Sequence, residues 1–367
     1  MRSQSPRRPQ TRRMASIAAI VGLALISAAC SSGSGSSTAT TATGGGSSTT
    51  SNAPVTLRLG YLTNLTHATA LVGIQRGTFV KDLPSNVTLQ TLTYNAGPAE
   101  VTALLAGSLD AAYMGPNSAI TAYSQGLKSI RIISGATSGG AALVVSPSIT
   151  SASQLKGTTI ATPQLGNTQD VALRTWLKKQ GLTFPGPNGG SGEVTILPED
   201  NATTLTSFEA GSIAGAWVPE PWATRMVDEG HGHVLVNEKT QWPNGQFSTT
   251  LLVITTGFLS AHPTVITDLL KGQIATTGFL NASPIQAAAD ANTELATVTG
   301  KPLKAAELAT AWSDMTFTND PIASSILTDL AHAKAAGFPT SNISGIFDLG
   351  PINQVLISEG KAKLTAP

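Results

Sequence analysis

Val55-Thr-Leu-Arg-Leu-Gly-Tyr61 alternates apolar and polar residues with the period of two that a β-strand requires. A helix is expected over residues 67–76, a second strand over 87–93 and a further helix over 98–106, which Gly107 ends. Strands that alternate with helices form mostly parallel sheets with helices on both faces, so this beginning predicts an α/β fold.

The alternation of strands and helices continues to residue 255, after which helices dominate. Further strands are expected at 110–114, 130–133, 141–146, 158–161, 193–197, 213–218 and 250–255, with helices at 117–125, 168–180 and 199–210. Four more helices are expected at 263–280, 284–299, 305–312 and 321–336. The sequence shows no repeat of 20–50 residues, which argues against a solenoid.

Composition excludes several classes of protein. The chain has 367 residues, 12% of them charged, and a single cysteine. This length allows about two domains, and one cysteine excludes a disulfide framework or a multi-cysteine metal site. Five of the 22 basic residues precede residue 30, and the remaining 17 face 21 acidic residues, a net charge of −4. A mildly acidic body argues against nucleic acid as a partner.

The first thirty residues have the features of an export signal. Five arginines lead into an apolar run over residues 14–29, which is short for a membrane span and ends at Cys30. The pattern resembles a bacterial lipoprotein signal, so residues 1–29 are expected to be removed and Cys30 to be lipidated. The alternative is an ordinary signal peptide that includes Cys30. Residues 30–53 are rich in Ser, Thr and Gly, which predicts a tether outside the cell membrane.

Three loops follow strands with small polar residues. The loop at 162–170 contains Gly166 and Asn167, and the loops at 114–118 and 137–141 are similar in composition. Free N–H groups at a helix start attract anions together with the helix dipole. Each loop alone is better explained as a well-capped helix end. Three such loops in one α/β chain favour a small-anion site, because ligands bind at the carboxyl ends of strands.

Residues 216–222 read Ala-Trp-Val-Pro-Glu-Pro-Trp, a segment in which two prolines restrict two tryptophans and Glu220. Such a segment suits the wall of a ligand site with one acceptor, or alternatively a buried tryptophan pair with a glutamate near a helix N-terminus.

Other motifs give little support for catalysis or metal binding. Ser138 loosely matches a hydrolase nucleophile, but a strand is expected after it where a helix is needed. Glu229, His231 and His233 have no further ligand nearby and are interpreted as a solvated turn. The phosphate-binding and dinucleotide-binding glycine motifs are both missing from the sequence, so no cofactor is expected.

Several of these segments resemble, in order and spacing, the solute-binding proteins of ABC importers in the nitrate, sulfonate and taurine branch. They are 60–68 (Gly-Tyr-Leu-Thr-Asn-Leu-Thr-His-Ala), 73–79 (Gly-Ile-Gln-Arg-Gly-Thr-Phe), 106–112 (Ala-Gly-Ser-Leu-Asp-Ala-Ala) and 216–222. The resemblance implies a type II periplasmic-binding-protein fold with two lobes, each a mostly parallel sheet flanked by helices. Two crossover strands would lie near 144–147 and 250–253. The first lobe would combine 54–146 with 251–367, and the second would be 147–250.

The resemblance also implies a ligand clamped between the lobes by clamshell closure, without covalent chemistry. The ligand would be a small oxyanion such as an aliphatic sulfonate, with taurine and nitrate as further candidates. Hydroxyl, amide and imidazole groups would donate to the anion, and Glu220 would accept from a ligand N–H or orient a donor. The expected ligand-binding residues are His67, Asn95, Gly97, Gly115, Asn117, Ser118, Ser138, Gly140, Gly166, Asn167, Thr168, Glu220 and Trp222.

Two alternatives stay open at this point. The ligand could be a thiamine-precursor pyrimidine or a flavin, with Trp222 stacked on its ring, or the protein could be an exported enzyme that uses Ser138 or forms a pyrimidine. The expected partners are ABC permease subunits with a separate ATPase, together with the outer face of the cell membrane through lipidated Cys30. The protein is expected to be a monomer without a metal.

Overall fold

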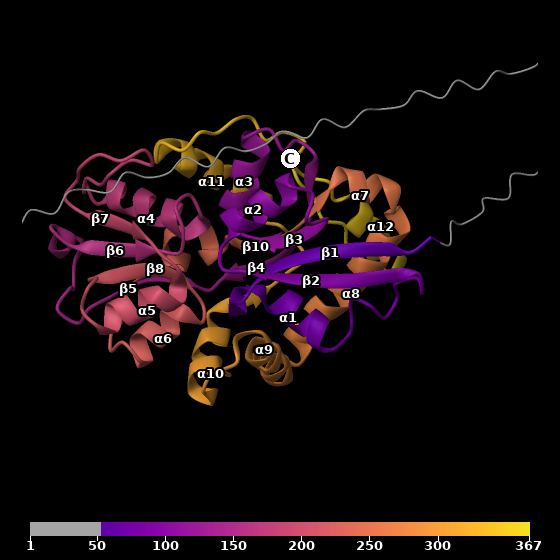
Figure 1. The fold of residues 1–367 in the computed structure, drawn as a ribbon, viewed down its shortest axis with the longest axis horizontal. Helices are drawn as coiled ribbons and strands as arrows, with labels where there is room; N and C mark the ends of the chain where they lie inside the picture. The colour runs from indigo at the N-terminus through magenta and orange to yellow at the C-terminus, as the bar shows by residue number, and fades with distance from the viewer. Residues whose placement is uncertain (1–52) are drawn as a thin grey trace, which may run out of the picture. The chain divides into compact units, whose positions relative to one another are not determined.

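The computed structural model describes residues 53–367, so the expected signal peptide, Cys30 and all but the last residue of the tether lie outside the described residues. The described part belongs to one compact unit with two sheets and helices on both faces of each (Figure 1). The expected α/β class is confirmed. Within residues 53–367, no helix combines the length and the apolar character that a bilayer crossing requires.

The larger sheet has six strands in the order β11-β4-β10-β3-β1-β2. Their bounds are β1 (Val55–Leu62), β2 (Val87–Tyr94), β3 (Ala111–Met114), β4 (Ile130–Gly139), β10 (Ser248–Thr255) and β11 (Met315–Phe317). Strand β1 pairs in parallel with β2 and β3, whereas β10 is antiparallel to both β3 and β4, and β11 is antiparallel to β4. Strands β1 to β4 therefore share one direction, as expected for a mostly parallel sheet.

The smaller sheet has five strands in the order β7-β6-β8-β5-β9. Their bounds are β5 (Ala141–Val145), β6 (Thr159–Thr162), β7 (Thr195–Pro198), β8 (Gly215–Pro219) and β9 (His233–Asn237). Only β5 runs against the other four. The chain passes directly from the larger sheet into β5, and from the smaller sheet into β10. In each sheet, the first strand after the crossing thus runs antiparallel to the strands on both sides of it. We call the parts built on the larger and smaller sheets the first and second lobes.

The expected crossing points are corrected by the strand pairing. Residues 141–145 pair with β8 and β9 in the second lobe, so the chain crosses at Gly140 and not at 144–147. Gly139 and Gly140 have φ of +82° and +75°, a conformation that favours glycine and turns the chain there. The apolar residues that follow, 141–145, do not indicate by their sequence which of the two sheets they join. The return crossing lies before Ser248, where β10 begins, and not at 250–253.

Helices cover both lobes close to the expected positions. In the first lobe they are α1 (Ala68–Gln75), α2 (Gly97–Leu105), α3 (Pro116–Ser124), α7 (Thr256–Ala261), α8 (Pro263–Ala282), α9 (Pro284–Thr299), α10 (Ala305–Ser313), α11 (Ala323–Ala335) and α12 (Gly350–Ser358), with the 3-10 turn η1 (Leu65–His67). In the second lobe they are α4 (Thr168–Lys179), α5 (Asn201–Glu209) and α6 (Trp222–Asp228). Short 3-10 turns complete the chain at η2 (Ala152–Leu155), η3 (Glu238–Gln241) and η4 (Pro243–Gly245).

The cores follow the periodicity of the sequence. Leu57, Leu59 and Tyr61 point to the same face of β1 and are fully buried against α1 and α8. The other face of the larger sheet is covered by α2, α3 and α11 (Figure 1). In the second lobe, α4 covers one face of the sheet, while α5 and α6 cover the other. Truncating one such leucine to alanine costs about 2–5 kcal/mol, so these faces fix the sheets on which the site is built.

Candidate functional site

The starts of four helices meet at a small cavity of about 20 Å³ between the two lobes. Helices α1, α2 and α3 come from the first lobe and α4 from the second. The cavity is lined by Leu62, Asn64, Thr66, His67, Gly97, Gly115, Ser118, Asn167, Thr168, Gln169, Pro219 and Thr249. Each of these helices begins where a strand has just ended, which is the position that the sequence predicted for a ligand.

The helix starts at this cavity present backbone N–H groups. No side chain caps α1, α2 or α3, whereas the Asn167 side chain accepts from the Asp170 N–H at the start of α4. Aligned peptide dipoles give each start a partial positive charge, and the starts of α2 and α3 also keep uncapped N–H groups, whereas α1 continues from η1, whose Leu65 carbonyl accepts the Ala68 N–H. Among the described residues, the cavity lining contains no charged side chain. This combination suits an anion, which directed N–H groups bind without a countercharge.

His67 contributes a neutral donor to the cavity. Its Nδ1 atom accepts a hydrogen bond from the Leu62 N–H at 3.2 Å, which places the imidazole proton on Nε2. Complete burial lowers the pKa of His67 to about 3, so the side chain stays uncharged at neutral pH.

The two lobes approach each other closely at this point. The Oγ1 atom of Thr168 is buried and has no hydrogen-bond partner in the protein. A Cβ added to Gly115 would lie 2.5 Å from that oxygen, and one added to Gly97 would clash with Ser118 Oγ. Glycine at these two positions therefore leaves the small cavity open and the Thr168 hydroxyl free for a ligand.

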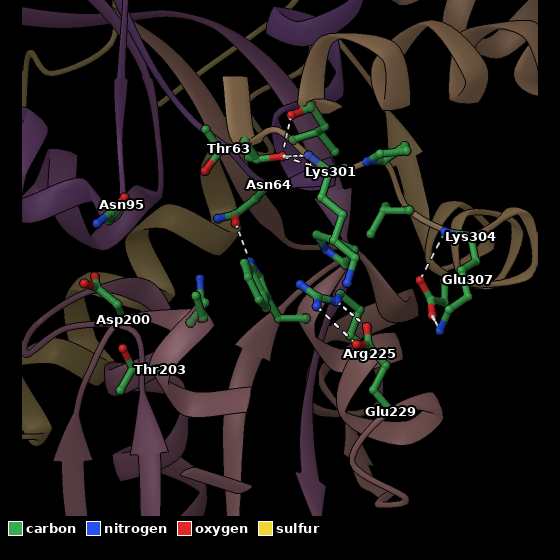
Figure 2. Close-up of a pocket in the computed structure, with 18 residues that line it drawn as sticks. Thr63, Asn64, Asn95, Asp200, Thr203, Arg225, Glu229, Lys301, Lys304 and Glu307 are labelled. Carbon is green, nitrogen blue, oxygen red and sulfur yellow. Dashed lines mark hydrogen bonds and ion pairs between the residues drawn. The ribbon is translucent and has the colours of Figure 1, made fainter. Parts of the chain in front are cut away.

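A larger cavity of about 430 Å³ is drawn in Figure 2. It shares Asn64 with the small cavity. Its first-lobe lining is Thr63, Asn64, Asn95, Leu295, Thr299, Lys301, Pro302, Leu303, Lys304 and Glu307. Its second-lobe lining is Asp200, Asn201, Ala202, Thr203, Pro221, Trp222, Arg225 and Glu229. Residues from both lobes thus line a single cavity.

Two hydrogen bonds join the lobes at the edge of this larger cavity. Trp222 Nε1 donates to Asn64 Oδ1 at 2.9 Å, and the Leu65 N–H donates to the Glu220 carbonyl at 3.0 Å. Both bonds connect residues 220–222, which end at the first residue of α6, to residues 64–65, which follow β1. Separation of the lobes would break them, so they belong to the closed arrangement.

The charges of the larger cavity are partly paired. Arg225 forms an ion pair with Glu229, and its guanidinium lies 4.8 Å from the Trp222 ring centroid. Lys304 pairs with Glu307 at 2.6 Å. The hydrogen bond from Arg225 and the nearby lysines hold the pKa of Glu229 below its usual value. Arg225 and Lys304 are therefore engaged by carboxylates, as Figure 2 shows, whereas the Lys301 ammonium forms no ion pair with another described residue.

Eight of the thirteen expected ligand-binding residues line these cavities. The small one is lined by His67, Gly97, Gly115, Ser118, Asn167 and Thr168, and the larger one by Asn95 and Trp222. The other five line neither cavity, and a role for them in ligand binding stays a prediction. Gly140 is the crossing point itself, and the Gly166 N–H donates to Asp170 Oδ2 at 2.9 Å.

The remaining three expected residues are engaged inside the fold. Asn117 Nδ2 lies 3.5 Å from the Asp329 carbonyl, and Ser138 Oγ accepts from the Phe247 N–H. The Glu220 carboxylate accepts from the N–H and the hydroxyl of Thr224, and burial raises its pKa to about 7. The Ser138 and Glu220 side chains thus accept from neighbouring backbone or helix groups, whereas Asn117 Oδ1 is buried without a partner.

The sequence prediction missed most of the larger cavity. Asn64 lies in the 60–68 segment, and its closeness in sequence to His67 could have indicated that it lines the site. Asn201 follows two acidic residues, Glu199 and Asp200, and the sequence analysis interpreted this segment only as the start of a helix. No local signal marked Lys301 or Lys304, which reach the site only through the packing of α10 against α6.

The segment with two histidines forms no metal site. Within residues 53–367, no group of three or more metal-binding side chains comes together. Glu229 pairs with Arg225, His231 occupies a left-handed turn with φ of 55°, and His233 begins β9. Part of the expected turn is thus an edge strand.

Solved structures share this architecture. The alkanesulfonate-binding protein SsuA from Xanthomonas axonopodis pv. citri, bound to MOPS, matches with a TM-score of 0.64 at 18% identity over 79% of this chain and 96% of that chain. The periplasmic nitrate-binding protein NrtA from Synechocystis PCC 6803 matches with a TM-score of 0.64 at 12% identity, over 83% and 89% of the two chains. At such identities the likeness shows the fold, and the expected two-lobed periplasmic-binding-protein fold is confirmed.

Sequence comparison gives the family. A protein of Brucella abortus strain 2308 named "Putative binding protein" is 30% identical over 172 residues, 46% of this chain and 49% of the relative, so the chain spans about half the length of that curated relative. The NMT1-like family model matches residues 51–298, which include every residue that lines the small cavity. This chain belongs to the NMT1-like family.

Proposed function

We propose that the protein is the exported substrate-binding component of an ABC importer and that it binds a small organic oxyanion, such as an aliphatic sulfonate, between its lobes. The observation that carries this proposal is the meeting of four helix starts from two lobes at one uncharged polar cavity. The names of structural neighbours that bind alkanesulfonate and nitrate agree with a ligand of this charge.

The two cavities suggest where each part of such a ligand lies. The small cavity holds about one water-sized group, so with the lobes closed it would receive one oxygen of the oxyanion. There the oxyanion would accept hydrogen bonds from backbone N–H groups, His67 Nε2 and the Thr168 hydroxyl. The organic part would extend past Asn64 into the larger cavity. Closure around the ligand would form the Trp222–Asn64 hydrogen bond and exclude water.

The alternatives receive less support from the same geometry. A flavin or pyrimidine would stack on Trp222, but the Arg225 guanidinium already lies over that ring. An enzyme using Ser138 would need that hydroxyl at a cavity, whereas it accepts from the Phe247 N–H. A binding role requires only the donors and the closure described above.

The cellular setting is part of the proposal. Export through residues 1–29, lipidation of Cys30 and a tether to residue 53 would keep a monomeric receptor at the outer face of the membrane. An ABC permease with a separate ATPase would receive the ligand there.

A thermal-shift screen of residues 53–367 tests the ligand class. The panel contains alkanesulfonates, taurine, nitrate, a thiamine-precursor pyrimidine and riboflavin. A ligand at a hundredfold excess over its Kd adds about 2.7 kcal/mol to the free energy of unfolding. We expect at least one sulfonate to raise Tm. A rise with riboflavin or the pyrimidine and none with the anions would overturn the proposal.

A further inference from the structure

A further cavity lies between the lobes, apart from the candidate site. Helix α4 of the second lobe and α11 of the first lobe lie side by side (Figure 1), and a cavity of about 320 Å³ opens between their C-terminal halves. We call it the α4–α11 cavity, and its lining includes Arg174, Thr175, Lys178 and Lys179 from α4, with His332 and Ala335 from α11. None of these residues lines either cavity of the candidate site.

The α4–α11 cavity carries positive charge that the protein does not balance. The Arg174 guanidinium is neutralised by Asp170, to which its Nε atom donates at 2.9 Å. Lys178 Nζ donates to the uncharged Ala335 carbonyl at 3.3 Å, and Lys179 forms no ion pair with another described residue. The C-terminal ends of α4 and α11 supply about half a negative charge each, so about one positive charge of the two ammonium groups remains unbalanced.

Two neutral donors complete the lining. The Oγ1 atom of Thr175 is buried and has no hydrogen-bond partner in the protein, which costs free energy unless a ligand pairs with it. Burial and the nearby Lys179 charge lower the pKa of His332, so its imidazole is neutral at pH 7 and offers one N–H. Ammonium, hydroxyl and imidazole donors around one cavity suit an oxyanion with several oxygens.

No carboxylate of the protein takes the place of such an anion. The lining of the α4–α11 cavity contains no acidic residue among those described. A cavity of about 20 Å³ that shares Thr175, Lys179 and His332 with it is also lined by Glu238. The Glu238 carboxyl oxygens accept from two tryptophan N–H groups, at 2.7 and 3.4 Å, and form no ion pair with Lys179.

The α4–α11 cavity is built from both lobes. The Lys178–Ala335 hydrogen bond joins the lobes, and the ring centroid of Phe338, which follows α11, lies 5.5 Å from the Arg174 guanidinium. Separation of the lobes would divide the cavity, so an anion bound there stabilises the closed arrangement. The start of α4 lines the small cavity, about 18 Å away along a helix of 12 residues, so both places can be filled at once.

We propose that the α4–α11 cavity binds a free divalent oxyanion, such as inorganic phosphate, separately from the transported ligand. The anion would accept hydrogen bonds from Lys178, Lys179 and Thr175, with His332 as a further donor. Because the anion favours closed lobes, it raises the affinity for a ligand that requires closure, and that ligand raises the affinity for the anion by the same factor.

Inorganic phosphate is the probe, and its Kd for the protein is measured by isothermal titration calorimetry at pH 7.5, with KCl holding the ionic strength constant. We expect Lys178→Gln and Lys179→Gln each to raise this Kd about three- to tenfold, and Thr175→Val to raise it less. Lys81→Gln is the control, because it removes the same charge from an exposed lysine that lines none of these cavities. The Tm of each variant in chloride separates loss of folding from loss of binding.

The affinity for the transported ligand gives a second readout. In saturating phosphate, the best ligand of the thermal-shift screen should bind at least about twofold more tightly to the parent, but not to Lys179→Gln. Equal phosphate affinity in the parent and both lysine variants, or no binding to the parent, would overturn the proposal. Phosphate binding that only Thr168→Ala weakens would also overturn it, because the phosphate would then lie at the helix starts.

Weaker ligand binding in phosphate would indicate competition and would overturn the stabilisation of the closed lobes. If no ligand of the screen binds, the proposed function fails, whereas the phosphate titrations still decide whether the α4–α11 cavity is an anion site.

Discussion

Replacing Gly115 with alanine is expected to weaken ligand binding at least tenfold while the fold stays intact. Gly115 has φ −70° and ψ 150°, which alanine adopts without strain. The new Cβ would lie 2.5 Å from Thr168 Oγ1 on the opposite lobe, about 1 Å short of an ordinary contact. Either the hydroxyl leaves the cavity or the lobes stay apart.

The magnitude follows from the hydrogen bond that is lost. A bond from a hydroxyl to a charged group contributes about 1.5–3 kcal/mol, and about 1.4 kcal/mol corresponds to a tenfold change in Kd. Gly278→Ala is the matched control, because no atom lies within 4 Å of a Cβ added at that position in α8. The control should bind like the parent and unfold at a slightly higher temperature, since alanine stabilises a helix by about 0.5–1 kcal/mol over glycine.

A double variant makes the reasoning refutable. The added Cβ would lie 3.5 Å from Thr168 Cβ, an ordinary contact, so removing the hydroxyl relieves the clash. Gly115→Ala combined with Thr168→Ala should therefore bind like Thr168→Ala alone, as measured by isothermal titration with the best ligand of the screen. Parent-like binding by Gly115→Ala, or strictly additive losses in the double variant, would show that this lobe contact is not part of the site.

Trp222→Phe removes the donor to Asn64 Oδ1, and stopped-flow measurement should show ligand dissociation about 2- to 10-fold faster, from a loss of about 0.5–1.5 kcal/mol; an unchanged rate would contradict a role in closure. Because burial lowers the pKa of His67 to about 3, ligand affinity should be flat from pH 5 to 8 by titration calorimetry, and tighter binding at pH 5 would indicate a charged imidazole. Burial raises the pKa of Glu238 to about 7. The contribution of its protonated carboxyl to the free energy of unfolding is therefore full below about pH 4.5 and is lost as the pH rises through 7. In urea titrations the free energy of unfolding of Glu238→Gln should fall less between pH 4.5 and 7 than that of the parent, and an equal fall would refute the raised pKa of Glu238. Cys30→Ala should release the protein from the membrane fraction or block its processing, whereas unchanged retention with processing elsewhere would exclude the lipid anchor.

The elements that the sequence predicted best are those whose burial is two-sided or strongly periodic. Strand β1 alternates, and α8 buries Val265, Ile266 and Leu269 at the expected spacing. Strand β9 was missed because it lies at a sheet edge with Val234 exposed, next to the glycines that indicate a turn. The start of α6 was considered only as the alternative interpretation of residues 216–222, because two prolines precede it, although a proline just before a helix start is compatible with the helix. The local sequence pattern thus predicted the central strands and the long covering helices better than the edge strands and the short helices.

The same distinction separates the two cavities. The small cavity is built from helix starts, which are local features that a sequence can reveal, and all its lining residues lie within the family match. The larger cavity needs Lys301, Lys304 and Glu307, which lie beyond residue 298 and reach Arg225 only through the packing of α10 on α6. A backbone-built oxyanion site tolerates changes of side chain, because its donors are N–H groups, whereas the charges around the rest of the ligand depend on individual residues. Differences in ligand between this chain and its structural neighbours should therefore arise at 200–203 and 299–307, not at the starts of α1 to α4.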